Sequence, residues 1–373
     1  MKIMFIFGGK QKGGAERVIT NLANGLIKNN KVSFLGVKKI DNLYKYNDNI
    51  PYYILDGEND KYHSFIDRNY KRVKKMIKFI KEDNPDIIIS FAGEQCYRTL
   101  FVNLFNKRKI IVSLRNDPVH EYKSLFTKIL MRLLYRRADG FVFQTEDARD
   151  YFSNRIRSKS IIIPNPINKQ FIGDPYKGKR EKIIVNAGRL APQKNQVLLI
   201  NAFAEFNKKN KNYKLYIYGE GELEEVLKNR IAELNLQKSI ILKGNVSNLK
   251  DEIANKALFV LSSDYEGMPN ALIEAMALGM PCISTDCPCG GPKYLIEDGK
   301  NGLLVPINDI NKLSDAMFKV LSNEEYAYKL GIEANKIKNR LDPRRIEDMW
   351  IGYIEKILDG GEKNERNKDR KDD

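Results

Sequence analysis

The sequence predicts an α/β protein with two doubly wound parallel sheets. Short apolar runs recur along the chain and alternate with stretches of helical period, a pattern typical of parallel strands covered by helices on both faces. The chain has 373 residues. Because a single hydrophobic core stops growing at roughly 250–300 residues, two domains are expected.

The first domain is expected to open with a strand at 3–7, a glycine loop, and a helix with Val18, Ile19 and Leu22 on its apolar face. Such a turn favours an anion, because backbone N–H groups and the helix dipole both point toward it. A tight turn without a ligand is the alternative. The other strands expected in this half lie at 32–37, 86–91, 109–113, 140–144 and 160–163.

Prolines and polar stretches divide the chain. The first domain is predicted to span 1–165, the linker 166–181 and the second domain 182–342, with a last helix at 343–358 and a disordered polar tail at 359–373. The strands expected in the second domain lie at 182–187, 213–218, 239–242, 257–261, 281–285 and 302–305.

Lysine and arginine outnumber aspartate and glutamate by 64 to 48, which gives a net charge of +16. This excess indicates an anionic partner, and nucleic acid, an anionic lipid surface and a phosphorylated substrate are the candidates. A lysine-rich composition without functional meaning is the fourth interpretation. No apolar run approaches the ~20 residues that span a bilayer, and the first one is too short for a signal peptide, so a cytoplasmic protein is predicted.

Two helices of the first domain are predicted to be basic and amphipathic. The helix expected at 62–81 carries Arg68, Arg72 and Lys75 beside an apolar stripe, and basic residues border the apolar face of the helix expected at 121–137. Helices of this kind rest on anionic membrane surfaces. An ordinary solvated face over a core stripe is the competing interpretation.

Four charged side chains of the second half form the candidate ligand site. Arg189 and Lys194 follow a β-branched strand, at the carboxyl end where open α/β sheets bind ligands, and two cations there suit a diphosphate. Glu266 lies in a Gly/Pro turn and Glu274 in a predicted helix. Carboxylates accept hydrogen bonds from sugar or ribose hydroxyls, so the set indicates a nucleotide-sugar.

A series of short motifs runs along residues 2–358. They are Gly13-Gly14-Ala15-Glu16, Pro164-Asn165-Pro166, Gly188-Arg189, Lys194-Asn195, Gly219-Glu220-Gly221, Gly244, Ser262 to Pro269, Glu274-Ala275, Gly290-Gly291-Pro292 and Asp298 to Val305. In this order and spacing the chain resembles the family 4 retaining glycosyltransferases. The resemblance implies the GT-B fold, with two facing Rossmann-like domains, an interdomain donor cleft, and a last helix that crosses back to the first domain.

The resemblance also implies an activity. The expected enzyme moves a hexose or N-acetylhexosamine from a UDP-sugar to a polyprenyl-diphosphate-linked glycan, forming an α-glycosidic bond in cell-surface polysaccharide or glycan biosynthesis. Arg189, Lys194 and Glu266 take the catalytic roles. The implied donor-binding residues are Gly13, Gly14, Gly188, Asn195, Gly267, Met268, Pro269, Asn270 and Glu274. No Asp-x-Asp motif occurs in the sequence, so neither a metal nor a cofactor is expected.

The acceptor is expected at the first domain, where Glu16, Arg115 and Asn116 are candidate contacts. Contact with the donor phosphate is the alternative role for Arg115 and Asn116. Many relatives carry a histidine near the reacting sugar, and Arg115 fills approximately that place here. The helix at 62–81 also resembles one that, in polymerising transferases of bacterial N-glycan assembly, grips a lipid-linked pyrophosphate. A peripheral position on the inner leaflet of the plasma membrane is therefore expected.

Three other functions fit parts of the pattern. A nucleotide-sugar epimerase can share the two-domain fold and differs in its product. A nucleic-acid-binding protein would explain the charge, but no interleaved aromatic and basic strand motif is present, so no nucleic-acid partner is expected. A nicotinamide dehydrogenase is disfavoured because neither sheet opens with Gly-x-Gly-x-x-Gly.

Overall fold

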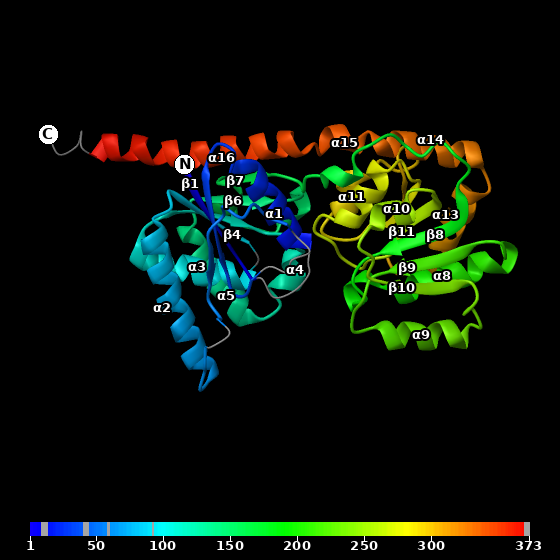
Figure 1. Cartoon of the computed structure of the whole chain (residues 1–373), viewed down its shortest axis with the longest axis horizontal. Coiled ribbons are helices and arrows are strands. Elements are labelled where there is room, and N and C mark those ends of the chain that lie inside the picture. The colour runs from blue at the N-terminus through cyan, green and yellow to red at the C-terminus, as the bar shows by residue number, and fades with distance from the viewer. Residues whose placement is uncertain (9–13, 40–44, 58–59, 92, 369–373) are drawn as a thin grey trace. The chain divides into compact units, whose positions relative to one another are not determined.

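The computed structural model describes residues 1–8, 14–39, 45–57, 60–91 and 93–368, with the backbone alone for 361–368. The chain divides into two compact units (Figure 1). Unit 1 contains Met1–Asn165 and the residues from Pro343 onward, and unit 2 contains Pro166–Asp342. Each unit has one parallel sheet, so the predicted fold class is confirmed.

The sheet of unit 1 has the strand order β3-β2-β1-β4-β5-β6-β7, and every neighbouring pair is parallel. Its strands are β1 (Lys2–Phe7), β2 (Lys31–Gly36), β3 (Tyr52–Ile54), β4 (Ile87–Phe91), β5 (Lys109–Ser113), β6 (Gly140–Phe143) and β7 (Ser160–Ile162). The edge strand β3 has only three residues, too few for its alternation to be read from the sequence. In this order the carboxyl ends of β4, β5, β6 and β7 are adjacent.

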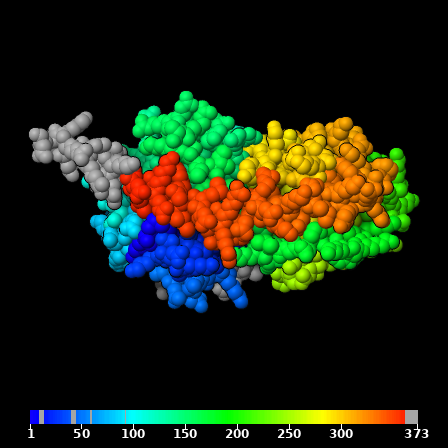
Figure 2. Space-filling view, turned by 90° about the horizontal axis from the view of Figure 1, so that it is seen from above, coloured from blue at the N-terminus to red at the C-terminus, as the bar shows by residue number. Residues whose placement is uncertain are grey.

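Helices cover both faces of this sheet (Figure 1). They are α1 (Gly14–Leu26), α2 (Phe65–Asp83), α3 (Gly93–Asn106), α4 (Pro118–Glu121), α5 (Leu125–Leu134), the 3-10 turn η1 (Tyr135–Arg137), α6 (Glu146–Asp150), α7 (Asn154–Arg157) and α16 (Pro343–Lys368). Figure 2 shows α16, in red, against the blue α1 segment, and both helices contribute to one core that includes Ile346 and Trp350.

Two helices differ from the prediction. The helix expected at 121–137 is broken into α4, α5 and η1, because Asp117 and Ser124 cap separate helices by accepting hydrogen bonds from Val119 N–H and Thr127 N–H. The helix α16 continues to Lys368, past the predicted start of the disordered tail at 359. The rest of that tail, 369–373, lies outside the described residues.

The sheet of unit 2 has the order β10-β9-β8-β11-β12-β13 and is also parallel. Its strands are β8 (Glu181–Ala187), β9 (Lys214–Tyr218), β10 (Ile240–Gly244), β11 (Lys256–Leu261), β12 (Cys282–Thr285) and β13 (Leu303–Val305). Ile167 and Phe171, from the segment expected as a linker at 166–181, lie in the core of this unit. That segment therefore packs with unit 2.

The helices of unit 2 follow the expected alternation with the strands. They are η2 (Lys169–Phe171), η3 (Pro192–Lys194), α8 (Gln196–Lys209), α9 (Glu224–Glu233), α10 (Leu249–Ile253), α11 (Asn270–Ala277), α12 (Gly291–Leu295), α13 (Ile310–Leu321), α14 (Glu324–Asn335) and α15 (Ile337–Arg340). In the part of the chain that the structure describes, no helix combines the length and apolar character needed to cross a membrane.

Candidate functional site

The loop that follows β8 carries Arg189 at the carboxyl edge of the unit 2 sheet. Gly188 N–H donates to the Tyr218 carbonyl over 3.0 Å. A side chain on Gly219, whose φ is 130°, would lie 2.0 Å from the Gly188 carbonyl oxygen, so these strand ends approach closely only because residue 219 is glycine. The exposed Arg189 comes next, and its carbonyl accepts a hydrogen bond from Gln196 Nε2 over 3.1 Å.

Asn195 ends this loop and caps α8. Its φ is 43°, in the left-handed region that asparagine tolerates, and its side-chain oxygen accepts from Leu198 N–H over 3.1 Å. Its amide nitrogen donates to Asp264 Oδ1 over 2.6 Å. The cap therefore fixes the chain directly after Lys194 and joins it to the loop that follows β11.

Three further hydrogen bonds connect these two loops. Asp264 N–H donates to the Gln193 carbonyl over 2.9 Å, and Gln193 Nε2 donates to the Tyr265 carbonyl over 2.9 Å. Ser262 Oγ donates to the Lys194 carbonyl over 3.0 Å. Segments that are far apart in the sequence thus form one connected edge of unit 2.

Glu266 is the carboxylate at the centre of this edge, and only 5% of it is exposed. Its Oε1 accepts hydrogen bonds from Ser263 Oγ over 2.7 Å and from Lys194 Nζ. Its backbone is held as well, because Glu266 N–H donates to the Pro288 carbonyl over 2.6 Å and the Glu266 carbonyl accepts from Cys289 N–H over 3.0 Å. The structure therefore brings two predicted catalytic residues, Lys194 and Glu266, into direct contact.

The other predicted donor residues of unit 2 lie in the loop after β11 and in α11. Gly267, Met268 and Pro269 are buried between Glu266 and α11, and Asn270 begins that helix. Glu274 lies on α11 with 2% of its surface exposed. Arg189 and Lys194 are cations that can bind a phosphate. The buried carboxylates of Glu266 and Glu274 can accept hydrogen bonds from hydroxyl groups.

The predicted contacts of unit 1 lie after β1 and β5. Gly13 lies outside the described residues, and Gly14 begins α1. In the first turn of α1, burial raises the pKa of the Glu16 carboxyl. Arg115 and the half-buried Asn116 directly follow Leu114, whose N–H bonds to the end of β6.

Arg115 has an unusual environment. Its guanidinium carbon lies 4.7 Å from the ring centre of Phe91 and 5.6 Å from that of Trp350. Its Nη1 donates to Asn165 Oδ1 over 3.0 Å. Burial lowers the pKa of Arg115 to about 9, because the interior disfavours the charged form. A cation thus lies at the carboxyl edge of the unit 1 sheet, stabilised by aromatic faces and an amide.

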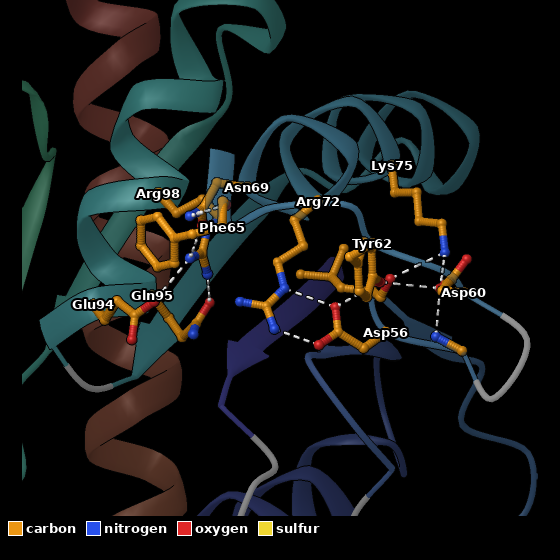
Figure 3. A network of polar contacts seen from close by, with 12 residues as sticks. Asp56, Asp60, Tyr62, Phe65, Asn69, Arg72, Lys75, Glu94, Gln95 and Arg98 are labelled. Carbon is orange, nitrogen blue, oxygen red and sulfur yellow. Dashed lines mark hydrogen bonds and ion pairs between the residues drawn. The ribbon is translucent and has the colours of Figure 1, made fainter. Parts of the chain in front are cut away.

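Two basic residues predicted to contact the acceptor instead face carboxylates of the preceding loop (Figure 3). Arg72 is 3% exposed and forms a two-pronged contact with Asp56, with Nε and Oδ1 2.7 Å apart. Lys75 contacts Asp60, and Tyr62 donates to Asp56 Oδ1 over 3.0 Å. Although burial acts to raise the pKa of Asp56, the hydrogen bonds from Arg72 and Tyr62 and the charges of Arg72 and Arg68 together outweigh it and lower that pKa. Arg72 is therefore withdrawn from solvent, whereas the Lys75 side chain remains 32% exposed.

Arg68 is the third basic residue expected to contact the acceptor. Its guanidinium carbon lies 5.5 Å from the ring centre of Phe65, and the side chain is half-buried. The phosphate-binding roles of Arg68, Arg72 and Lys75 remain predictions.

Sequence reasoning missed two residues beside the predicted ones. Ser263 lies three residues before Glu266, inside the motif already recognised, so its donation to the carboxylate had a local signal. Trp350 contacts Arg115 from α16. No local pattern indicates that contact, because it depends on the path of the last helix.

Two family descriptions cover most of the chain. Residues 12–171 match Glycosyltransferase Family 4, and residues 169–337 match Glycosyl transferases group 1. An uncharacterized glycosyltransferase of Methanocaldococcus jannaschii is 32% identical over 339 residues, covering 76% of this chain and 83% of that protein.

A second relative has a more specific name. The Campylobacter jejuni GalNAc-alpha-(1->4)-GalNAc-alpha-(1->3)-diNAcBac-PP-undecaprenol alpha-1,4-N-acetyl-D-galactosaminyltransferase is 26% identical, covering 96% of this chain and 99% of that protein. Among solved structures, Anabaena HepE in complex with UDP matches with a TM-score of 0.81 at 17% identity, covering 95% of this chain and 100% of HepE. This likeness shows the fold. The chain belongs to glycosyltransferase family 4, and its predicted enzyme class, a glycosyltransferase, is confirmed.

Proposed function

We propose that the protein transfers a hexose or N-acetylhexosamine from a UDP-sugar to a polyprenyl-diphosphate-linked glycan, with retention and formation of an α-glycosidic bond. The observation that carries the proposal is the contact between Lys194 and Glu266 at the carboxyl edge of the unit 2 sheet. The names of two Campylobacter jejuni relatives, 26% and 29% identical, support a PP-undecaprenol-linked or diphospho-undecaprenol-linked acceptor. HepE structures that contain UDP or UDP-glucose support the donor.

The proposed reaction exchanges one bond at the anomeric carbon. The bond from that carbon to the β-phosphate oxygen breaks, and the acceptor hydroxyl oxygen bonds to the same face of the sugar. The hydroxyl proton passes to the departing UDP. Arg189 and Lys194 offset the negative charge that grows on the diphosphate, and stabilisation of this kind is usually the largest catalytic contribution. Because two side-chain cations supply this charge, the transfer is proposed to need no metal ion.

Glu266, the carboxylate proposed to bind the sugar, is held by two neighbouring side chains. Lys194 Nζ has three N–H donors, and one of them is directed at Glu266. No other described carboxylate pairs with Lys194, so its two remaining donors are proposed to bind the diphosphate. When the ammonium shifts toward the phosphates, Ser263 still donates to Glu266 Oε1.

Three neighbouring helices of unit 1 support a position at a membrane. Helix α3 contacts both α2 and α5, and all three expose large apolar side chains, which we call the three-helix surface. Its apolar members are Phe65, Ile66 and Tyr70 on α2, Phe101, Leu104 and Phe105 on α3, and Leu125, Phe126, Ile129 and Leu133 on α5. The exposed fractions reach 79% at Ile66 and 74% at Leu125. Apolar side chains exposed to this extent on adjacent helices mark an interaction surface.

Exposed basic residues lie on two helices of the three-helix surface and on the segments beside α5. The exposed basic residues of α2, of α5 and of the segments beside α5 are Lys74, Lys78, Lys81, Lys123, Lys128, Arg132, Arg136 and Arg137. Apolar side chains combined with cations match the chemistry of an anionic lipid surface. The enzyme is therefore proposed to bind peripherally to the cytoplasmic leaflet, where a polyprenyl-linked acceptor is embedded.

A transfer assay tests the proposed function. The purified chain is incubated with EDTA, a short-chain polyprenyl-diphosphate-linked sugar and, in turn, UDP-glucose, UDP-galactose, UDP-GlcNAc and UDP-GalNAc. One donor is expected to give UDP and an extended acceptor whose new linkage is α by NMR. An epimerised free nucleotide-sugar formed without acceptor would favour the epimerase instead. A β linkage, or a strict requirement for added metal, would contradict the corresponding part of the proposal.

A further inference from the structure

One edge of the Arg115 guanidinium has no hydrogen-bond partner among the residues that the structure describes. Nη1 is used by Asn165 Oδ1, and the faces of Phe91 and Trp350 lie against the group. Nε and Nη2 are shielded from solvent and have no hydrogen-bond partner among the described residues. These two groups form the fork with which arginine binds two oxygens of a phosphate or carboxylate.

Two buried polar atoms in adjoining parts of the fold are also unsatisfied. Gln144, 2% exposed, donates its Nε2 to the same Asn165 oxygen over 2.6 Å, and its Oε1 accepts no hydrogen bond from any described residue. Ser113, fully buried two residues before Arg115, has an Oγ without a partner in the described chain. Since buried polar groups are normally hydrogen-bonded, the unused donors of Arg115 and Ser113 indicate an acceptor outside the described residues. Gln144 Oε1 is itself an acceptor, so it gives no support for an anion.

We propose that Arg115 is an anion-binding residue of unit 1, whose Nε and Nη2 bind one phosphate of a diphosphate-bearing substrate. Asn165, Phe91 and Trp350 hold the guanidinium in the orientation that presents this edge. A phosphate there completes two parallel charge-assisted hydrogen bonds.

This inference rests on the proposed function, which supplies two substrates with the same chemistry. Both the UDP-sugar donor and the polyprenyl-linked acceptor contain a diphosphate. The test must therefore separate binding of a nucleoside diphosphate from binding of an isoprenoid diphosphate.

The chain carries its own reporter for this test. Trp350 is the single tryptophan of the sequence, it is 1% exposed, and its ring centre lies 5.6 Å from the Arg115 guanidinium carbon. Because the partnerless edge is shielded before binding, an anion that reaches it must rearrange its surroundings. The fluorescence emission of Trp350 is expected to change when that happens.

The experiment titrates the full chain with inorganic pyrophosphate, UDP or geranyl diphosphate while tryptophan emission is recorded. The variants are Arg115→Lys, which keeps the charge and loses the fork, and Arg115→Gln, which loses both. Arg155→Gln, at an exposed arginine on α7 of the same unit, is the matched control. Pyrophosphate is expected to change the wild-type emission saturably and to bind Arg115→Lys about ten-fold or more weakly, as the loss of a charge-assisted hydrogen bond implies. The control is expected to behave as wild type.

The outcomes show whether Arg115 binds the diphosphate of the donor or that of the acceptor. Weaker binding of geranyl diphosphate in the Arg115 variants, with unchanged UDP binding, assigns the site to the acceptor, and the reverse assigns it to the donor. The inference is overturned if none of the three probes changes the wild-type emission. It is also overturned if Arg115→Lys, shown to be folded by circular dichroism, binds all three with wild-type affinity.

Arg189→Ala distinguishes this failure from failure of the proposed function. Loss of UDP binding in Arg189→Ala, alongside wild-type binding of every probe in the Arg115 variants, would leave sugar transfer standing and remove the role of Arg115. If pyrophosphate binding depends on Arg115 but the chain transfers no sugar, the role of Arg115 in anion binding stands and the proposed function fails.

Discussion

At the scale of single residues, the candidate site depends on one carboxylate oxygen held by two different groups. Glu266 Oε1 accepts from Lys194 Nζ and from Ser263 Oγ. A diphosphate would compete with Glu266 for the lysine, whereas it would leave the buried serine in place. If the proposed function holds, Ser263 is expected to act as a positioning residue that keeps the Glu266 carboxylate oriented when Lys194 moves.

Ser263→Ala is expected to lower kcat by about ten-fold or more and to change KM little, because a hydrogen bond to a charged acceptor contributes roughly 1.5–3 kcal/mol. Ser262→Ala is the matched control, since that neighbouring serine is equally buried and donates to the neutral Lys194 carbonyl. Steady-state kinetics with the best UDP-sugar would measure both variants. Equal kcat values for the two variants would refute the positioning role.

Glu121 gives the chain a predicted dependence of stability on pH. Burial raises the pKa of this carboxyl to about 7 from an ordinary value of 4.5, although Gly93 N–H donates to Oε1. Between those values the folded chain binds a proton that the unfolded chain has released. The contribution of Glu121 to stability therefore falls as pH rises through this window.

Glu121→Gln removes that titration while keeping an acceptor for Gly93 N–H. Relative to wild type, the variant is expected to gain on the order of 2 kcal/mol in the free energy of unfolding between about pH 5 and about pH 8. Urea denaturation at both pH values would measure it. A difference between variant and wild type that stays constant across the window would contradict the raised pKa.

At the scale of elements, helix α2 was predictable from its periodicity, but the partners of its charged side chains were not. The periodicity predicts a basic helix, and the structure contains one at Phe65–Asp83. However, Arg72 contacts Asp56, which lies 16 residues earlier in a loop, and this contact follows from the tertiary structure (Figure 3). Exposed residues such as Lys74 and Lys81 carry the charge that the proposed contact with an anionic lipid surface would use.

The three-helix surface predicts binding to anionic vesicles through α5. Replacing Leu125 and Phe126 together by glutamate is expected to weaken co-sedimentation with phosphatidylglycerol vesicles by ten-fold or more, because each large apolar side chain contributes roughly 1.5–3 kcal/mol when buried. The two residues are 74% and 71% exposed, so the unfolding temperature is expected to change little.

Phe318→Glu is the matched control for this experiment, because Phe318 is a 50% exposed phenylalanine on α13 of unit 2. Its binding to vesicles is expected to equal that of wild type. Equal binding by the double α5 variant and this control would exclude α5 as the lipid contact.

At the scale of the whole molecule, both parallel sheets were predictable because most strands are unbroken apolar runs. The strand β3 was not, because Tyr52–Ile54 is short and half-buried. The two residues of the proposed catalytic pair were predictable from their motifs. Their contact joins Lys194 and Glu266, 72 positions apart, and it follows only from the tertiary structure. The same holds for Trp350 beside Arg115, which depends on α16 packing in unit 1.

The central claim is that Lys194 and its loop neutralise the departing nucleotide while Glu266 orients the sugar. The most direct measurement is the rate of UDP release from the preferred UDP-sugar, with acceptor present, for wild type, Lys194→Ala and the control Lys209→Ala. Lys209 is an exposed lysine at the far end of α8. The account predicts a loss of about a hundred-fold or more for Lys194→Ala alone, the usual effect of removing one preorganised stabilising group. Equal rates for Lys194→Ala and wild type would contradict it.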